Sequence, residues 1–417
     1  MSMNNIANSY MNSIGMPKIK HSEALSSTLN TQHASRVKND VFFKGLNKTF
    51  TLSKAKSLKD IPKDANIFIF DYKNKLTIPS EQKIKECIIT DKNLGFWKKM
   101  TVGEDGNVMK LRNNTVEYAH GDITDKKRTC GIIDANNSKI NQIENVNTVN
   151  LKNNSDVGYI DNVGYINAYN SKIGTANAEH VITLNGDCEA DSLSAKYTVA
   201  IYPGDKVNKA SGIWVACKSD ASTPYKYSII HDLDAAEGAE ISQAKVTGKA
   251  KTKDLVIDNA IANEVEAAYA LTFNNSVVDN LKLANVNKMT DSKINKFDLY
   301  FANNGVRFEN KVQINELKIH DDNSKLFFFP KKEWGKNTDN YIKKIIIGND
   351  NDSYILSGKP TIKIQGDINI DTIIFKQGTG KVEVVGPQKT EKPINVINGY
   401  IKYDAPKEIP PTNEDFD

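Results

Sequence analysis

Residues 136–186 decide the fold, because they read as three aligned segments: NNSKINQIENVNTVNLK at 136–152, NNSDVGYIDNVGYINAY at 153–169 and NSKIGTANAEHVITLNG at 170–186. The serines of these segments, Ser138, Ser155 and Ser171, lie 17 and then 16 residues apart. Apolar residues of the first two segments match position by position; they are Ile140, Ile143, Val146, Val149 and Leu151, then Val157, Ile160, Val163, Ile166 and Ala168. Such self-similarity at a short, nearly fixed spacing indicates a repeat architecture.

The spacing of the apolar residues fits neither a flat strand nor a helix, since it runs in steps of three closed by a step of two. Polar pairs fill the gaps, and we interpret Asn141-Gln142, Glu144-Asn145 and Asp161-Asn162 as corners. Asn, Asp and Gly tolerate the backbone conformations that corners need. The sequence therefore predicts an all-β protein, a parallel β-solenoid (β-helix) of short strands with irregular corner loops, in which stacked coils bury one apolar column.

The same apolar signature returns downstream with wider spacing. Five hexapeptides carry it: Val278-Asp-Asn-Leu281-Lys-Leu283, Ile294-Asn-Lys-Phe297-Asp-Leu299, Ile314-Asn-Glu-Leu317-Lys-Ile319, Ile342-Lys-Lys-Ile345-Ile-Ile347 and Ile370-Asp-Thr-Ile373-Ile-Phe375. Their starts lie 16, 20, 28 and 28 residues apart. Coils that lengthen in this way predict loops inserted at the corners, where solenoids commonly carry specificity.

The pattern divides the chain into four regions. Residues 1–38 lack periodicity and predict a disordered leader, and residues 39–130 predict a small β-rich domain or a cap of the solenoid. The solenoid is expected over 131–403, with an insertion or break around 187–254, where Ala and Lys are frequent. Residues 404–417 hold three prolines and several acids, and they predict a disordered tail.

Composition narrows the classes of function. A net charge of +4 over 417 residues, with only four arginines, argues against nucleic acid as a partner. The chain has no conventional secretory signal and no apolar run long enough to span a membrane, so the expected location is the cytoplasm or the exterior by a non-classical route. Four scattered cysteines predict reduced thiols rather than a metal site or a disulfide framework.

The aligned segments resemble parallel β-helix proteins in general, over about two thirds of the chain, by periodicity rather than by a signature motif. Coils near 17 residues with Asn, Asp or Gly at the corners are similar to the bacterial, self-assembling bactofilins, although bactofilin cores are shorter and lack 28-residue coils. Pectate-lyase-like enzymes, phage tailspikes and secreted adhesins share the architecture. Because fold does not carry function across that set, the resemblance names an architecture only.

Candidate sites were sought among acids and tyrosines. His231, Asp232 and Asp234 place two carboxylates on one side of a strand beside an imidazole, a set that could perform acid–base chemistry, and the alternative is an exposed acidic strand or turn. Four acids in loops provide oxygen ligands of the kind that Ca²⁺ prefers; they are Asp321, Asp322, Asp350 and Asp352, and ordinary surface turns are favoured over a calcium site. Tyr159 and Tyr165 lie at outward positions and could stack on sugars.

These observations favour a non-enzymatic solenoid that serves as a scaffold or binding protein, with no cofactor. Self-association and contact with a protein or glycan surface are the expected partner modes, because open solenoid ends expose unpaired strand edges. The alternative is a glycan-binding or glycan-cleaving β-helix protein that uses acids on adjacent coils.

Overall fold

The computed structural model describes the following residues of the chain: 47–54, 57–71, 77–90, 108–122, 131–321, 323–329, 340–348, 360–366, 369–376, 378–385 and 393–404. The chain divides into two compact units, residues 1–150 with 155–158, and residues 151–154 with 159–417. The leader predicted at 1–38 lies outside the described residues, as does the predicted tail from residue 405 onward.

The first unit consists of short parallel strands with two 3-10 turns near its start, η1 (Leu52–Lys54) and η2 (Leu58–Asp60). Its strands are β1 (Thr49–Thr51), β2 (Ile67–Phe70), β3 (Lys83–Ile89), β4 (Val108–Arg112), β5 (Thr115–Gly121), β6 (Ile132–Asn136) and β7 (Lys139–Glu144). Pairing runs β1–β2–β3–β5–β7 in one column and β4–β6 in another. The described strands of 39–130 therefore form stacked coils.

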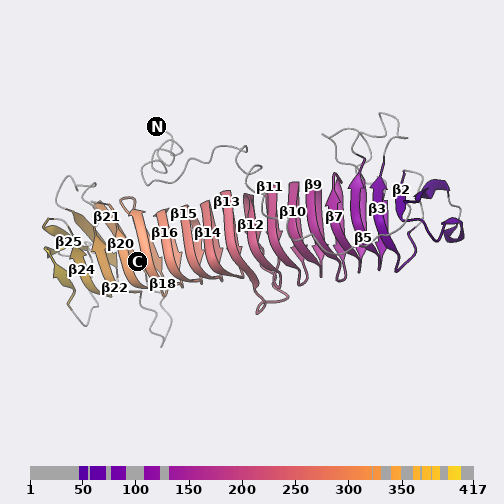
Figure 1. Cartoon of the computed structure of the whole chain (residues 1–417). Helices are drawn as coiled ribbons and strands as arrows, with labels where there is room; N and C mark the ends of the chain where they lie inside the picture. The colour runs from indigo at the N-terminus through magenta and orange to yellow at the C-terminus, as the bar shows by residue number, and fades with distance from the viewer. Residues whose placement is uncertain are drawn as a thin grey trace, which may run out of the picture. The chain divides into compact units, whose positions relative to one another are not determined.

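The second unit has the same architecture, and Figure 1 shows its strands stacked side by side. Its strands are β10 (Lys172–Asn185), β11 (Glu189–Ile201), β12 (Lys206–Cys217), β13 (Ser228–Ser242), β14 (Ala244–Asp258), β15 (Ile261–Asn274), β16 (Val277–Val286), β17 (Lys288–Thr290), β18 (Lys293–Phe301), β19 (Val306–Glu309), β20 (Gln313–Ile319), β21 (Asn323–Phe329), β22 (Tyr341–Ile347), β23 (Thr361–Gly366), β24 (Ile370–Phe375), β25 (Gly380–Val385), β26 (Asn395–Ile397) and β27 (Gly399–Asp404). Strands β8 (Thr148–Lys152) and β9 (Asp156–Tyr169) contain residues of both units.

Every strand pairing among the described residues is parallel and joins one coil to the next, which confirms the predicted parallel β-solenoid. The apolar residues numbered above in the first two segments and the five hexapeptides are all buried, whereas Ile374 of the last hexapeptide is half-buried. Ile140 and Ile143 show the reason for the unusual spacing. The two polar residues between them both lie outside the core, so the strand bends there and the next apolar residue again points inward.

Several corners of the coils combine a residue in the left-handed backbone region with a small buried residue. Asn275 has a φ of 42° and is followed by buried Ser276, and Asn137 has a φ of 48° and precedes buried Ser138. Asparagine adopts this region more readily than most non-glycine residues. Its abundance in the sequence therefore has a structural cause, as the corner interpretation predicted. Asn141-Gln142, which the sequence predicted as a corner, lies within β7 and is the outward pair between Ile140 and Ile143.

The buried corner serines form a hydrogen-bonded column along the coils. The backbone N–H of Ser276 donates to Ser292 Oγ at 3.2 Å, and Ser292 Oγ donates to the carbonyl of Thr290 at 2.6 Å. In the first unit, Asn114 N donates to Ser138 Oγ at 3.2 Å in the same way. Each hydroxyl thus satisfies a backbone group that would otherwise be buried without a partner.

Residues 187–254, where the sequence pattern predicts an insertion or a break, form β11 to β14, which pair in parallel with their neighbours and show register shifts, for example between Gly212 and Trp214. Small residues take several inward positions there, and Ala190, Ala195 and Ala210 are buried. The stack of strands therefore runs on through this region, and residues 218–227 form a loop between β12 and β13. Within the described residues, Cys87, Cys188 and Cys217 are buried free thiols, as predicted.

Candidate functional site

The predicted acid–base group lies on the outer face of β13. His231, Asp232 and Asp234 are exposed, and Leu233 between the two acids is buried, so both carboxylates point outward on one side of the strand. His231 Nδ1 lies 3.1 Å from Thr247 Oγ1 on the next coil, and Asp232 Oδ1 accepts a hydrogen bond of 3.0 Å from the backbone N–H of Lys249. The neighbours of these groups on adjacent coils decide their role.

Asp234 belongs to a line of outward side chains whose charge alternates from coil to coil. The register pairs Asp234 with Lys251, then Lys251 with Glu266 on β15. The full line, here called charge column 1, is Asp234, Lys251, Glu266, Lys282, Asp298 and Lys318. Opposite charges that face each other on neighbouring strands attract, and like charges there repel.

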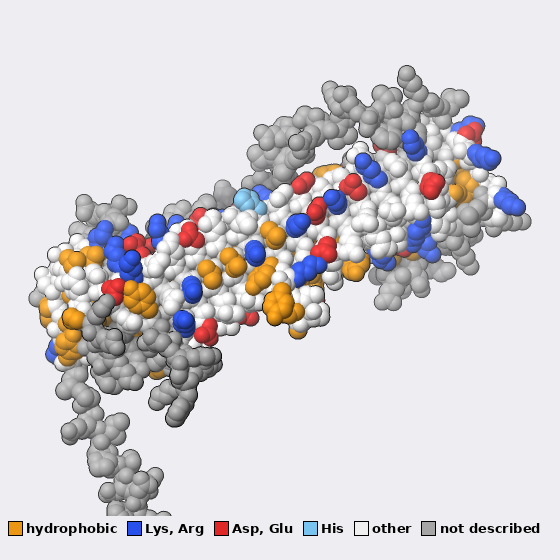
Figure 2. Space-filling model, turned by 90° about the horizontal axis from the view of Figure 1, so that it is seen from below, with side chains coloured by type: hydrophobic (Ala, Val, Ile, Leu, Met, Phe, Trp, Pro, Cys, Tyr) orange, Lys and Arg blue, Asp and Glu red, His pale blue; other side chains and the backbone are white. Residues whose placement is uncertain are grey.

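Asp232 lies in a second line, which the register extends to the preceding coil and which the backbone N–H of Lys249 joins to the following coil. Lys209 pairs with Asp232, and Lys249 on the following coil pairs with Glu264. This charge column 2 comprises Lys209, Asp232, Lys249, Glu264, Asn280, Lys296, Glu316 and Lys344, with one neutral position. The face in Figure 2 likewise shows acidic and basic side chains interspersed.

Lys249 joins the two columns. Its Nζ lies 2.9 Å from Glu264 Oε1 and 2.6 Å from Glu266 Oε2. The hydrogen bond to Glu266 raises the pKa of Lys249, with a further contribution from Glu264. Carboxylates that face lysines on both sides hold the coils together in register. A pair of acids suited to glycoside hydrolysis would face a substrate instead.

Tyr165 takes part in an exposed aromatic line, here called the aromatic column, that crosses three strands of the second unit. The rings of Tyr165 and His180 have centroids 4.9 Å apart, and those of His180 and Tyr197 are 5.9 Å apart. Tyr165 and Tyr197 are 42% and 47% exposed, so both rings remain available to a flat apolar ligand. Tyr159, the other tyrosine predicted to bind sugars, is half-buried on β9.

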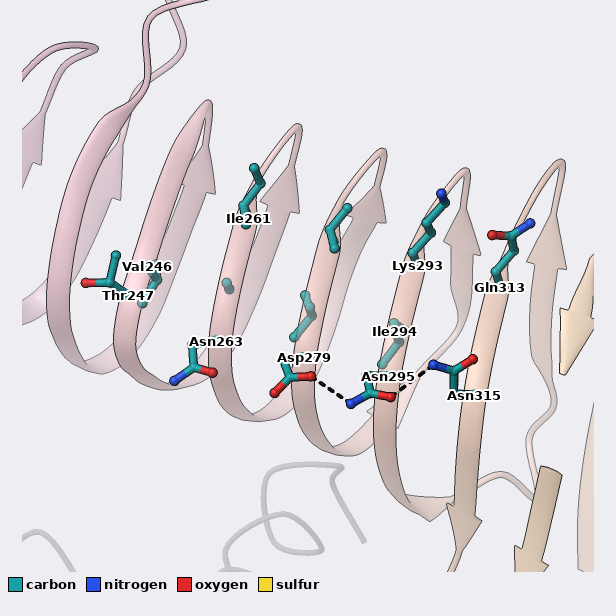
Figure 3. A pocket seen from close by; sticks show the side chains of 13 residues that line it. Val246, Thr247, Ile261, Asn263, Asp279, Lys293, Ile294, Asn295, Gln313 and Asn315 are labelled. Atoms are coloured by element: carbon teal, nitrogen blue, oxygen red, sulfur yellow. Dashed lines mark hydrogen bonds between the residues drawn. The ribbon is translucent and has the colours of Figure 1, made fainter. Parts of the chain in front are cut away.

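A shallow groove of about 650 Å³ crosses β14 to β20 on the side of the second unit. Its floor includes Ile261 and Val277, which are 44% and 47% exposed. Along it runs a row of short polar side chains, and Figure 3 shows Asp279, Asn295 and Asn315 joined by hydrogen bonds of 2.8 and 3.0 Å. The groove thus offers one polar group per coil beside an apolar strip, a surface suited to an extended polymer.

One of the four predicted calcium ligands lies among the described residues and has a role inside the fold. Asp321, a predicted calcium ligand, accepts hydrogen bonds from the backbone N–H groups of Ala302 at 3.1 Å and Asn323 at 3.3 Å, so both its oxygens stabilise a corner. The other predicted ligands, Asp322, Asp350 and Asp352, lie outside the described residues. Across the described ranges, no three His, Cys, Asp or Glu side chains gather closely enough to hold a metal ion.

The first unit contains a compact polar cluster that the sequence pattern did not reveal. The rings of Tyr118 and His120 stack with centroids 4.4 Å apart. His120 Nε2 lies 2.8 Å from Glu86, and the Tyr118 hydroxyl donates to Glu144 at 2.9 Å. Burial, aided by the bond to Glu144, raises the pKa of Tyr118. Because these groups bond to one another across three coils, they stabilise the stack.

No protein-family model, curated protein or solved structure matches this chain. In the described part of the structure, no helix has the length and hydrophobicity of a membrane span. The fold and its outer surfaces are therefore the basis for any functional assignment.

Sequence reasoning missed both charge columns, although a signal was present. The fifth residues of the first three hexapeptides are Lys282, Asp298 and Lys318, which alternate in charge. The groove and the aromatic column gave no comparable signal, because the variable loop lengths hide which side chains lie on neighbouring coils. His180, for example, follows Tyr165 by 15 residues, and Tyr197 follows His180 by 17 residues.

Proposed function

We propose that this protein is a non-enzymatic scaffold whose stacked coils hold surface groups at fixed intervals. The observation that carries this proposal is that Asp232 pairs with Lys209 and Asp234 pairs with Lys251 on adjacent coils, within lines of side chains whose charge alternates. These acids face lysines of adjacent coils and so contribute to coil stacking, which leaves them poorly placed for proton transfer to a substrate.

A polysaccharide depolymerisation screen, combined with unfolding measurements, tests this role. We expect the wild-type protein to leave a broad glycan panel intact, and Asp232→Asn and Asp234→Asn to lower stability modestly. Asp191→Asn is a matched control, because Asp191 is an exposed outward acid that accepts a hydrogen bond of 3.1 Å from the neutral Asn208. Depolymerisation by the wild type that is lost in both column variants and kept in the control would overturn the scaffold proposal.

A second candidate function is glycan binding without cleavage, at the aromatic column. The exposed rings of Tyr165 on β9 and Tyr197 on β11, with His180 on the coil between them, provide the flat apolar faces on which sugar rings stack. Neighbouring strands lie roughly 4.8 Å apart, so successive coils could contact successive parts of one extended chain.

A glycan array with three proteins tests this second candidate. We expect wild-type binding to be lost in the double variant Tyr165→Ala/Tyr197→Ala and kept in Val277→Lys, which alters only the groove. Loss in Val277→Lys alone would move the ligand to the groove. Failure of the wild-type protein to bind any glycan would remove the candidate and leave the scaffold role untouched.

A further inference from the structure

One line of outward side chains changes character along the second unit. It begins with alternating charges, since Lys172 pairs with Glu189 and Glu189 pairs with Lys206. Two oxygens of Glu189 lie 2.9 and 3.6 Å from the Nζ atoms of these lysines. On the following coils the line continues through Ile229, Lys245, Ile261, Val277, Lys293, Gln313 and Tyr341. Over the described coils from β12 to β22, the line therefore contains no acid.

Lys245 and Lys293 consequently lack an opposite charge. Both are exposed, and neither forms an ion pair with any residue that the structure describes. Their neighbours in the line are all uncharged. The Nζ of Lys245 lies 5.3 Å from the ring centroid of Tyr227, a contact that leaves the ammonium charged. The surface thus presents two lysines whose charges an acidic partner can neutralise.

Apolar residues of the groove lie between these two lysines. Ile261 and Val277 are 44% and 47% exposed on its floor. The four residues Lys245, Ile261, Val277 and Lys293 are here called the lysine-flanked strip. Exposed apolar groups on adjacent coils form a patch that a partner can cover. Because stacked strands lie roughly 4.8 Å apart, the Cα atoms of the two lysines, three coils apart, are separated by about 14 Å.

A row of short polar side chains runs beside the strip, and Figure 3 shows Asn263, Asp279 and Asn295 within it. The Asp279 carboxylate accepts hydrogen bonds of 2.8 Å from Asn295 and 3.0 Å from Asn280, and it keeps its negative charge. The side-chain amide of Asn263 has no hydrogen bond to another described residue, so its donors and its acceptor are available. The row therefore disfavours an acid near the middle of the strip and can bond a ligand that offers both donors and acceptors.

An extended polypeptide matches this arrangement. Each residue of a strand advances about 3.3 Å, and the side chains at i, i+2 and i+4 lie on one face. Acids at i and i+4 are therefore about 13 Å apart, close to the separation of the two lysines. An apolar residue at i+2 then lies over Ile261 and Val277, away from any acid. The backbone N–H and C=O groups of such a segment are suitable partners for the amide of Asn263.

Two other occupants match less well. A second copy of this chain, related by a two-fold axis on the strip, would place Lys245 of each copy near Lys293 of the other, and like charges repel. A glycan with a carboxylate on every sugar would place further acids beside Asp279 and over the apolar residues, where no described lysine of the strip compensates them.

We propose that the lysine-flanked strip binds an extended segment of another protein that carries acids at i and i+4 and an apolar residue at i+2. The segment lies along the stacking direction, across β14, β15, β16 and β18. Lys245 and Lys293 contact its acids, and Ile261 and Val277 contact its apolar side chain. This inference goes beyond the scaffold role, because it assigns one part of the surface a partner of defined chemistry.

Fluorescence anisotropy with the full-length protein and labelled synthetic peptides tests the site. The probe peptide has Glu-Thr-Val-Thr-Glu at its centre, where β-branched residues favour an extended backbone. The control peptide has Glu-Thr-Val-Glu-Thr, which has the same composition and charge but places the second acid on the opposite face. We expect the probe to bind about fivefold more tightly than the control peptide, and added salt to weaken its binding.

Two protein variants locate the binding. Lys245→Gln/Lys293→Gln removes both charges of the strip and should weaken probe binding about five- to tenfold, since surface ion pairs contribute modestly. Lys206→Gln is the matched control, because Lys206 belongs to the same line but lies 3.6 Å from Glu189, outside the strip. This control should bind the probe like the wild type. Equal circular dichroism spectra verify that both variants fold.

Several results would overturn the proposal. Equal affinity for the two peptides shows that the strip does not recognise the spacing of the acids, and equal binding by the wild type and the double variant places the contact elsewhere. Binding of an oligouronate but not of the probe, lost in the double variant, would assign the strip to an acidic glycan. A dimer detected by light scattering and lost in Val277→Lys would assign it to a second copy. Each result leaves the scaffold role standing, since unfolding and depolymerisation measurements test that role separately.

Discussion

Lys249 offers the sharpest test of the charge columns, through the substitution Lys249→Glu. The wild-type ammonium contacts Glu264 and Glu266 at 2.9 and 2.6 Å, and all three side chains are partly exposed. Partly exposed ion pairs contribute roughly 0.2–1 kcal/mol each, and like charges that face each other cost similar amounts. Loss of two attractions and gain of two repulsions predicts a destabilisation of about 2 kcal/mol.

Denaturant unfolding followed by circular dichroism measures this change, with Lys293→Glu as the control. Lys293 is exposed on the same unit, and its register neighbours Val277 and Gln313 are uncharged. We expect that reversal to change stability by less than about 0.5 kcal/mol, as for ordinary surface substitutions. The swap Lys249→Glu/Glu264→Lys should recover part of the loss, because it restores one opposite-charge pair.

Salt separates the electrostatic explanation from a packing defect. Screening at about 1 M salt reduces the Debye length to roughly 3 Å, so the difference between Lys249→Glu and the wild type should shrink there. Equal destabilisation by the two reversals, or a loss that salt leaves unchanged, would refute the claim that alternating charges hold the coils in register.

Two further predictions concern the buried corner column. Burial raises the pKa of Asp205 to about 6, despite hydrogen bonds from the N–H groups of Tyr202 and Cys188. Because the folded state then binds the proton more tightly than the unfolded chain, this group's contribution to stability is full below about pH 4 and declines by about 2–3 kcal/mol as pH rises through 6. Asp205→Asn should flatten that slope in denaturant titrations between pH 4 and 7, and an unchanged slope would contradict the assignment. Ser292→Ala should lower the free energy of unfolding by about 1–3 kcal/mol, since it leaves the buried N–H of Ser276 without its acceptor; a loss no larger than that of an exposed serine would refute this role.

The sequence was sufficient for the architecture because the period of the apolar residues is a local property. The matched spacing from Ile140 to Leu151 and from Val157 to Ala168 required each repeat to turn the same residues inward, and all of these residues are buried. Asparagine at the corners was equally readable, since its tolerance of the left-handed region belongs to the residue itself. Residues 187–254 were harder to read because alanine occupies several inward positions there, and alanine gives a weak apolar signal.

The sites depended on the tertiary structure, because they combine residues from different coils. Asp232 and Asp234 looked like a pair of acids within one strand, and only the register showed Lys209 and Lys251 as their neighbours. The lack of an acid beside Lys245 and Lys293 likewise follows from the register, which places uncharged residues next to both. By itself the sequence determined the coil, the corners and the core, which arise from interactions within one repeat. The tertiary structure alone decided which surface groups meet, because corner loops of unequal length set the register between repeats.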